Sequence, residues 1–353
     1  MVSTDIVFLV LSGKDRFIMQ EENKEYFRLE FVNNVKHDVL LDVSIVIPTY
    51  NRKNSLLNAL LSLCEQDHPY NKFEVIVVDD GSNDGTDVMI KSLSLPFGVK
   101  YLWQYHAGRR VGRARNIGYR HASGEVVIFI DADVICVSNF IKRHVDKHKM
   151  DRNLVISGGM FLLKKNQPID IKWLARKPLN KARAIIHKIK RTRLRYLHNN
   201  GELDLSTFFC TMNVSVRREN LAKTNGFDEE FDGVWAEEDV EFGYRLGLIG
   251  LRSEFDIEAA VYHQWHPCDV TKPYANRNRL LLFSKHLKLL SYKIISNRIN
   301  DYYLYTEDEI KLLLEKAREQ NILVKENRPK QLFRRIWLLL YLIVPGLLDI
   351  FSN

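Results

Sequence analysis

The run Ile128-Phe129-Ile130-Asp131-Ala132-Asp133 places two carboxylates, two positions apart, directly after a short apolar stretch. Apolar runs of this length, bounded by polar residues, are typical of a parallel strand that is buried on both faces. In open α/β sheets, ligands bind just outside the carboxyl ends of the strands. Two aspartates there repel each other unless a cation lies beside them, and hard divalent cations prefer oxygen ligands. The run therefore predicts a cation site at the end of a buried strand, although solvated loops often carry an isolated Asp-x-Asp.

Strands and helices alternate along the chain on either side of this run. Apolar, β-rich runs predict four strands, at residues 44–47, 74–78, 101–104 and 126–130. Helical spacing of apolar residues predicts four helices, at 54–64, 87–93, 111–121 and 140–148. Such alternation with short links favours an α/β fold, in which a mostly parallel sheet is flanked by helices.

The composition changes before and after this region. Residues 1–41 alternate apolar and polar around two turn-like breaks, which predicts three short antiparallel strands as an accessory element. Residues 42–270 form the predicted main domain, and residues 271–353 a helical extension with an apolar tail. A dense basic cluster lies within residues 172–195, either as a solvated helix face or as a surface for an acidic acceptor or anionic lipid.

The overall charge narrows the classes of partner. The chain has 353 residues, 46% of them hydrophobic, and a formal net charge of +8, which favours phosphates, nucleotides or anionic lipid surfaces. No motif of a nucleic-acid-binding module occurs, so nucleic acid is not an expected partner. The four cysteines lie far apart without a Cys-x-x-Cys pair, so we expect a reducing compartment and neither disulfides nor a zinc site.

The apolar tail leaves two interpretations open. Residues 336–350 are nearly all apolar, follow Arg334 and Arg335, and are interrupted by Pro345-Gly346. This is shorter than the roughly 20 residues of a spanning helix. It predicts either an interfacial helix on an anionic membrane or a terminal helix packed on protein. With no signal peptide at residue 1, we expect a cytoplasmic protein. The basic cluster and the apolar tail together favour a peripheral position on the inner membrane face, which requires the interfacial-helix interpretation.

Two further polar motifs follow predicted strands, and a third opens a helix. Pro48-Thr49-Tyr50-Asn51-Arg52 follows the first strand, and Asp79-Asp80-Gly81-Ser82 the second. Asp80 can accept a hydrogen bond from a nucleobase, and Gly81 lets the backbone approach closely. Gly112-Arg113-Ala114-Arg115 begins a helix, and its arginines and helix N-terminus suit a diphosphate.

This ordered set resembles the family 2 glycosyltransferases of the GT-A fold. The matching motifs are Ser44-Ile-Val-Ile-Pro-Thr-Tyr-Asn-Arg52, Val77-Val-Asp-Asp-Gly-Ser82, Ala114-Arg-Asn-Ile-Gly118 and Phe129-Ile-Asp-Ala-Asp133. The resemblance implies a nucleotide-sugar donor, usually a UDP-sugar, and Mn²⁺ or Mg²⁺ as the cofactor. It implies that Asp80 contacts the base, Asp131 the ribose or the metal shell, and Asp133 the metal. The remaining donor-binding residues that we predict are Pro48, Thr49, Tyr50, Asn51, Arg52, Arg113, Arg115 and Ala132.

The second half resembles the acceptor region of galactosyltransferase-like and chondroitin-polymerase-like enzymes. This resemblance rests on the motif Trp235-Ala-Glu-Glu-Asp-Val-Glu-Phe-Gly-Tyr-Arg-Leu246. Those enzymes place a Glu-Asp pair at the start of a helix, which implies Asp239 as the catalytic base and Glu238 as an acceptor ligand. Trp235 is a predicted acceptor-binding residue. Trp235 and Trp265 can both stack on a sugar face, and a place in the hydrophobic core is the alternative for each. Glu237 leaves the register open by one residue, and an acidic helix start that only caps the helix is the alternative.

Val261-Tyr-His-Gln-Trp-His-Pro267 supplies a histidine where such enzymes place a metal ligand. We predict His263 as that ligand and keep His266 as its rival. The resemblance divides the main domain into a nucleotide-binding half, residues 42–135, and an acceptor half, residues 205–267.

The sequence thus predicts a metal-dependent, inverting glycosyltransferase that acts in polysaccharide or glycoconjugate synthesis on a glycan or lipid-linked acceptor. Two alternatives stay open: a peptide or small-molecule acceptor, and a non-catalytic scaffold that binds nucleotide sugars or associates with membranes. A nucleotidyltransferase is disfavoured, because such enzymes usually carry a glycine-rich basic loop after the first strand.

Overall fold

The computed structural model describes residues 7–10, 16–19, 27–33, 40–177, 179, 209–234, 236–267, 277–278, 281–282 and 284–286. The chain forms two compact units, one of Met1–Gly233 with Glu238–Asp269 and one of Val234–Glu237 with Val270–Asn353. The sheet and the helices that cover it belong to the first unit. The apolar tail, most of the basic cluster and nearly all of the predicted helical extension lie outside the described residues.

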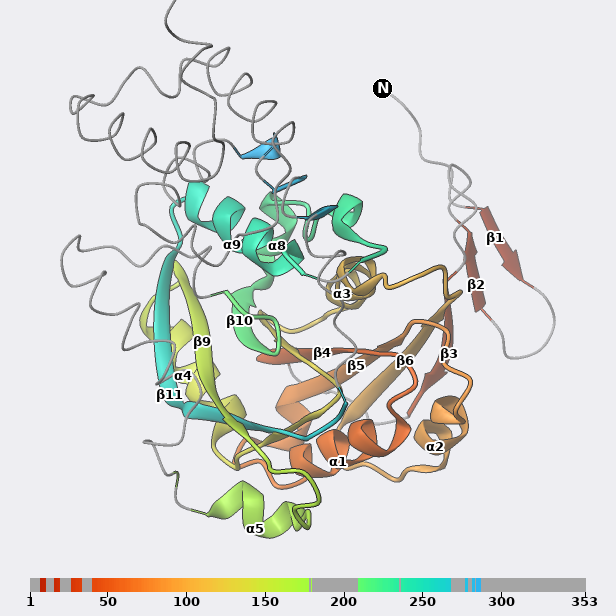
Figure 1. Cartoon of the computed structure of the whole chain (residues 1–353), viewed down its shortest axis with the longest axis vertical. Helices are drawn as coiled ribbons and strands as arrows, with labels where there is room; N and C mark the ends of the chain where they lie inside the picture. The colour runs from red at the N-terminus through yellow and green to blue at the C-terminus, as the bar shows by residue number, and fades with distance from the viewer. Residues whose placement is uncertain are drawn as a thin grey trace, which may run out of the picture. The chain divides into compact units, whose positions relative to one another are not determined.

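Four parallel strands form the centre of an eleven-stranded sheet, in the order β6-β5-β4-β7 (Figure 1). They are β4 (Val43–Thr49), β5 (Phe73–Asp79), β6 (Gly98–Gln104) and β7 (Val126–Ile130). Every residue of β4, β5 and β7 is buried, as the near-continuous apolar runs predict for strands covered on both faces. The predicted parallel α/β sheet is therefore confirmed.

Three strands extend this sheet at the β6 edge. β1 (Val7–Val10), β2 (Arg16–Met19) and β3 (Phe27–Val32) are antiparallel, and β3 pairs with β6. The three predicted N-terminal strands are thus present, and they continue the main sheet.

The other edge carries strands that return in the opposite direction. β10 (Asn213–Arg217) lies antiparallel between β7 and β9 (Leu154–Leu162). β11 (Arg252–His263) runs parallel to β9 and pairs antiparallel with the short β8 (Val134–Cys136). The β8–β11 pair matters for function, because β8 begins directly after the second aspartate of the opening motif.

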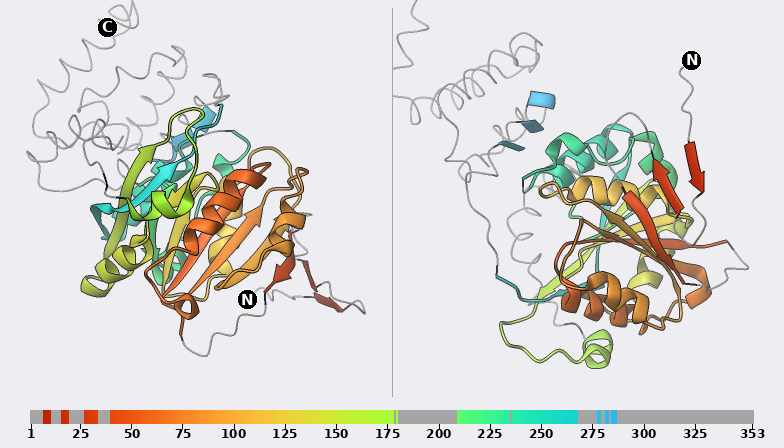
Figure 2. Two further views of the ribbon diagram at one scale, coloured as in Figure 1. Left: turned by 90° about the horizontal axis from the view of Figure 1, so that it is seen from below. Right: turned by 90° about the vertical axis from the view of Figure 1, so that its right-hand side faces the viewer.

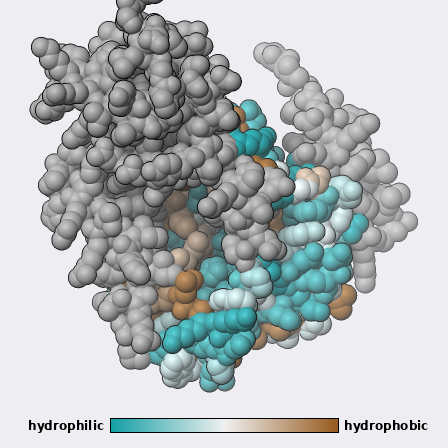
Figure 3. Space-filling model, viewed as in Figure 1, coloured by the Kyte–Doolittle hydropathy of each residue, from teal (hydrophilic) through white to brown (hydrophobic). Residues whose placement is uncertain are grey.

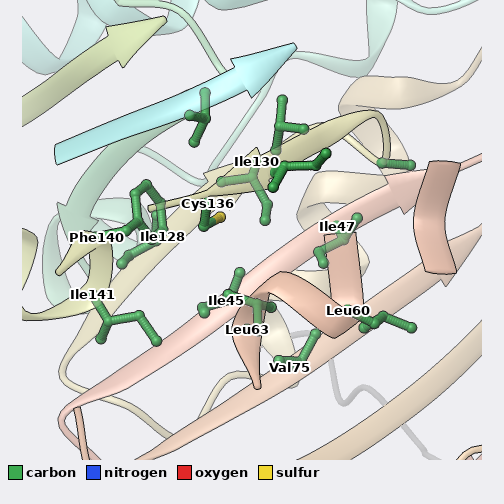
Figure 4. Packing of buried hydrophobic residues seen from close by; sticks show 14 of the residues in the cluster. Ile45, Ile47, Leu60, Leu63, Val75, Ile128, Ile130, Cys136, Phe140 and Ile141 are labelled. Atoms are coloured by element: carbon green, nitrogen blue, oxygen red, sulfur yellow. The ribbon is translucent and has the colours of Figure 1, made fainter. Parts of the chain in front are cut away.

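Helices cover both faces of the sheet (Figure 2). Residues of β4 that alternate along the strand enter two separate cores. Ile45 and Ile47 pack with Leu60 and Leu63 of α1, as Figure 4 shows, whereas Val46 packs with α3 on the opposite face. The first core includes residues of α1 (Lys53–Leu63), α2 (Thr86–Ser92), α4 (Phe140–Met150) and α5 (Ile171–Arg176). The second includes residues of α3 (Val111–Arg120), α8 (Arg218–Lys223) and α9 (Glu238–Leu248).

The last turn of α3 packs closely against the middle of β4. A Cβ at Gly118 would lie 2.3 Å from Cγ1 of Val46, so only glycine allows the helix this near to β4. The described part of the chain also contains two short 3₁₀ helices, η1 (Tyr70–Lys72) and η3 (Glu229–Phe231). Hydrophilic residues predominate over the coloured part of the face in Figure 3, as expected where helices turn their apolar sides to a sheet. Among the described helices, none combines the length and hydropathy needed to cross a membrane.

Candidate active site

The turn between β7 and β8 brings the two aspartates of the opening motif against the end of β11. In the β8–β11 ladder, Val134 lies opposite His263. The backbone N–H of Gln264 donates to the carbonyl of Asp133 over 2.8 Å. Residues 130 positions apart in sequence thereby become neighbours, and the histidine motif is fixed beside Asp133.

Asp133 and two histidines form a cluster that could hold a metal ion. Asp133 Oδ1 lies 3.5 Å from Nε2 of His263, and Oδ2 lies 3.0 Å from Nε2 of His266. One ligand atom from each of the three residues lies within 4.8 Å of the others. Oδ1 of Asp133 is buried and has no hydrogen-bond partner in the described part of the chain. A lone buried carboxylate oxygen beside two imidazoles suits a divalent cation such as Mn²⁺.

The charge of Asp133 is unfavourable in this cluster as it stands. Burial raises the pKa of Asp133, and the neighbouring charge of Asp131 raises it further, against the opposing effect of His263, His266 and Arg52. Arg52 Nη2 lies 3.3 Å from Nδ1 of His266. A bound cation would offset the burial and repulsion that disfavour the ionised carboxylate. His263 stays a predicted metal ligand, and His266 lies within reach of the same cation.

Hydrogen bonds join the loops that follow β4 and β5 at the carboxyl ends of the two strands. Asn51, which has a left-handed backbone with φ of 49°, donates its N–H to Ser82 Oγ over 2.8 Å. Its side-chain oxygen accepts from the N–H of Asn83 over 2.9 Å. Thr49 and Pro48 are buried at the end of β4, and the hydroxyl of Thr49 has no hydrogen-bond partner among the described residues. These contacts fix the loop that carries the predicted nucleoside-binding residues.

Asp80 lies in a polar pocket next to these loops. Its carboxylate accepts from Nε2 of Gln104 over 2.6 Å and lies 3.0 Å from Nδ1 of His106. The His106 ring stacks on Tyr50, with centroids 4.0 Å apart and planes 4° apart. Burial raises the pKa of Asp80, although the hydrogen bond from Gln104 works against this. The sequence did not single out Gln104 or His106, whose only signal is their position at the carboxyl end of the third predicted strand.

Arg115 joins the donor side of the site to the acidic helix α9. Its Nη2 lies 3.2 Å from Oδ1 of Asp131, and its Nη1 lies 3.0 Å from Oε1 of Glu238. Burial alone lowers the pKa of Arg115, but the charges of Asp131, Glu238 and Asp239 raise it to a net value above normal. Arg115 is therefore a buried cation held between carboxylates, in a different setting from the open diphosphate contact that the sequence suggests.

The N-terminus of α3 also has an internal partner. The carboxylate of Asp232 accepts from the backbone N–H groups of Gly112, over 2.9 Å, and Arg113, over 3.0 Å. These amides are engaged by Asp232, so the expectation that they face a diphosphate is not supported. The Arg113 side chain donates from Nε to Oε1 of Gln104 over 3.2 Å. Burial raises the pKa of Asp232 to about 7, despite the two backbone hydrogen bonds.

The acidic motif lies at the start of α9, as predicted. Ala236 and Glu237 enter the helix with φ of 83° and 76°, two successive left-handed residues that are not glycine. Such backbone costs on the order of 1–3 kcal/mol per residue and is common at functional sites. Glu238 is paired with Arg115, and Asp239 is the next carboxylate, partly exposed in the first turn. Trp235 lies outside the described residues.

Comparisons with known proteins bear on the family and the fold of this chain. A family model described as glycosyl transferase family 2 matches residues 44–223. The chain is 30% identical to the validoxylamine A glucosyltransferase of Streptomyces hygroscopicus subsp. jinggangensis, over 70% of this chain and 62% of the relative. It is 30% identical to the chondroitin synthase of Escherichia coli, over 68% of this chain and 37% of that protein. The chain thus spans less than two thirds of the length of either relative.

A solved structure supports the fold. The crystal structure of S. aureus TarS 1–349 in complex with UDP-GlcNAc superposes with a TM-score of 0.52 at 18% identity, covering 82% of this chain and 78% of that one. At this identity the likeness bears on the fold alone, and it agrees with the expected GT-A architecture.

Proposed function

This chain belongs to glycosyltransferase family 2, and on that premise we propose that it transfers a sugar from a nucleotide-sugar donor to an acceptor hydroxyl with inversion at the anomeric carbon. We propose a UDP-sugar as the donor and polysaccharide or glycoconjugate synthesis as the role. The observation that carries the proposal is the pair of contacts through which Arg115 joins Asp131 to Glu238. Through it, the aspartate motif and the acidic start of α9 face one reaction space.

The nucleoside would lie against the linked loops after β4 and β5. Asp80 presents a carboxylate to a nucleobase N–H, and Tyr50 together with His106 gives an aromatic stack at the same place. The unpaired hydroxyl of Thr49 offers a further polar contact within this described region. Since the loops are already joined by hydrogen bonds, little ordering is needed when the donor binds.

In this proposal the metal site lies beside the diphosphate of the donor. Asp133, His263 and His266 would hold Mn²⁺ or Mg²⁺, which when bound neutralises charge on the leaving diphosphate. Arg52, next to His266, adds a positive charge on the same side of the cluster.

Asp239 is the proposed base. Its position in the first turn of α9 favours the ionised carboxylate, because the helix dipole is positive there. As the acceptor oxygen bonds to the anomeric carbon, its proton passes to Asp239, and the bond from that carbon to the diphosphate oxygen breaks with its electron pair. Glu238, held by Arg115, would orient the acceptor hydroxyl, and Trp235 would contact the acceptor ring.

The acceptor class has two candidates. The name of the E. coli relative favours a glycan acceptor, and the name of the Streptomyces relative favours a small molecule. We propose a glycan or lipid-linked acceptor reached at an anionic membrane surface on the cytoplasmic side, with no role for nucleic acid. The net charge of +8 supports the anionic surface.

Release of the nucleoside diphosphate from UDP-sugars in the presence of Mn²⁺ tests the proposal. We expect turnover with at least one donor sugar. In Asp239→Asn the turnover rate should fall by about 10²–10⁴-fold, which is the usual contribution of a general base. Glu230→Gln, an exposed carboxylate in neighbouring η3, is the matched control. A folded protein that binds UDP but turns over no donor, with any acceptor tried, would favour the non-catalytic scaffold.

A further inference from the structure

A polar pocket of about 240 Å³ lies beside Gln264 and Trp265. The first turns of α1 and the loop that follows β9 form the rest of its wall. Its lining residues are Asn54, Ser55, Asn58, Leu163, Lys164, Asn166, Gln167, Ile169, Gln264 and Trp265. None of the proposed donor, acceptor or catalytic residues is among them, so the established motifs do not account for it.

The wall of the pocket is rich in carboxamide side chains. Five of the ten lining residues carry carboxamides and none carries a carboxylate, imidazole or thiol, so the wall lacks the charged and imidazole ligands typical of metal sites. Each carboxamide offers a donor and an acceptor side by side. The side chains of Asn54 and Asn166 have no hydrogen-bond partner among the described residues, so they are available to a ligand. Paired donors and acceptors of this kind match the adjacent hydroxyls of a sugar ring.

Trp265 adds an apolar face to these polar groups. Its side chain is 47% exposed, and Nζ of Lys165 lies 5.0 Å from the centroid of the ring. An exposed indole beside amides offers a flat surface for the C–H face of a sugar, together with an N–H donor. The volume lies below the ~300–1,000 Å³ of pockets for drug-sized ligands, which suits one sugar ring.

Gln264 connects the pocket to the cluster of Asp133, His263 and His266. Oε1 of Gln264 accepts from Asn58 over 2.8 Å, its Nε2 donates to the carbonyl of Ser55 over 3.0 Å, and its backbone N–H donates to Asp133. Gln264 and Trp265 also lie between His263 and His266 in sequence. A ligand in the pocket would therefore contact the segment that positions both histidines.

We propose that this pocket is a second carbohydrate subsite, which binds one sugar residue of a glycan while the donor site is occupied. The proposal rests on the proposed function only for the source of the sugar, a glycan that the enzyme extends. Lys164 and Lys165 at the rim favour a sugar that bears a carboxylate over a neutral one.

Saturation-transfer NMR with free monosaccharides tests the subsite. The probes are glucose, N-acetylglucosamine and glucuronate, each added to the full chain in saturating UDP and Mn²⁺. We expect a signal from at least one sugar that UDP does not remove, and a loss of at least about tenfold in affinity in Trp265→Ala and in Asn54→Ala. Trp173→Ala is the matched control, because Trp173 is 56% exposed, has Nζ of Lys177 4.2 Å from its ring centroid, and does not line the pocket.

Three outcomes would overturn the subsite: no signal from any of the sugars, a signal that UDP abolishes, or equal losses in Trp265→Ala and Trp173→Ala. Failure of UDP itself to bind would count against the proposed function instead. In that case a sugar signal that depends on Trp265 and Asn54 would still support the pocket as a carbohydrate site.

Discussion

Arg115 Nη1 lies 3.0 Å from Oε1 of Glu238, although 123 residues separate them in sequence. The other terminal nitrogen of the same guanidinium contacts Asp131. A buried arginine with two carboxylate partners fixes the distance between the aspartate motif and the start of α9. In the proposed mechanism, the alignment of donor and acceptor depends on this side chain, which is itself shielded from solvent.

Removing this cation should impair both stability and transfer. Arg115→Met leaves Asp131 and Glu238 without their common partner, and breaking a buried pair costs about 3–5 kcal/mol. We expect kcat/KM to fall at least about 100-fold, because misplacement of about 1 Å carries that cost. Arg115→Lys keeps the positive charge but lacks the planar guanidinium that contacts two carboxylates. Its kcat/KM should therefore lie between those of Arg115→Met and the wild type.

The control for these variants is Arg120→Met, an exposed arginine at the end of the same helix. Chemical unfolding and steady-state kinetics together give the comparison. If Arg115→Met kept wild-type kcat/KM with only its stability reduced, the alignment role would be excluded.

Three single substitutions decide the register of the acidic motif. Glu237→Gln should leave kcat within about threefold of wild type, whereas Asp239→Asn should lose about 10²–10⁴-fold. Glu238→Gln should mainly raise KM for the acceptor, since Glu238 orients the hydroxyl and does not take its proton. A loss of kcat in Glu238→Gln that matched the loss expected for Asp239→Asn would shift the base by one residue.

Both histidines beside Asp133 should contribute to metal affinity. We expect His263→Ala and His266→Ala each to weaken Mn²⁺ binding by about 10–100-fold, in titrations followed by electron paramagnetic resonance. His121→Ala, which changes a histidine at the C-terminal end of α3, is the control. Unchanged affinity in His266→Ala would restore the single-histidine site that the sequence favours.

Asp232 should give the stability of the fold a distinct pH dependence. Its pKa is about 7 in the folded chain, against ~3.9 for an unfolded aspartate. Between these values the folded chain holds the extra proton, so the free energy of unfolding falls as pH rises through the window and levels off above it. The fall is at most about 4 kcal/mol, at 1.36 kcal/mol per pKa unit.

Urea unfolding between pH 5.5 and 8 measures this effect in wild type and in Asp232→Asn. The variant lacks the titration, so its free energy of unfolding should decline less over that range. Glu230→Gln, two residues away and exposed, should keep the wild-type slope. Equal slopes in wild type and Asp232→Asn would show that the carboxyl of Asp232 ionises normally.

The sequence predicted the parallel centre of the sheet well, because its strands are continuous apolar runs and its helices have clear spacing. It missed β8, β9 and β10. β8 has only three residues, β9 contains two glycines within its apolar run, and β10 is a five-residue strand in which polar and apolar residues alternate. The candidate site was harder to predict than the sheet. Motifs after strand ends identified Asp80, Asp131 and Asp133, since their place in the fold follows from chain order. The contact of Arg115 with Glu238 and those of the α3 amides with Asp232 could not be found, because they join segments more than 100 residues apart.

The central claim is that Asp133 and its histidines bind a metal ion that helps to hold the donor nucleotide. The most direct test is the melting temperature of the full chain with UDP, with Mn²⁺ and with both, in wild type and Asp133→Asn. A ligand that binds only the folded chain raises its stability with the logarithm of ligand concentration over Kd. We expect a clear rise for wild type with UDP and Mn²⁺ together, little rise with either alone, and none in Asp133→Asn. A rise that is the same without Mn²⁺, or the same in Asp133→Asn, would contradict the account.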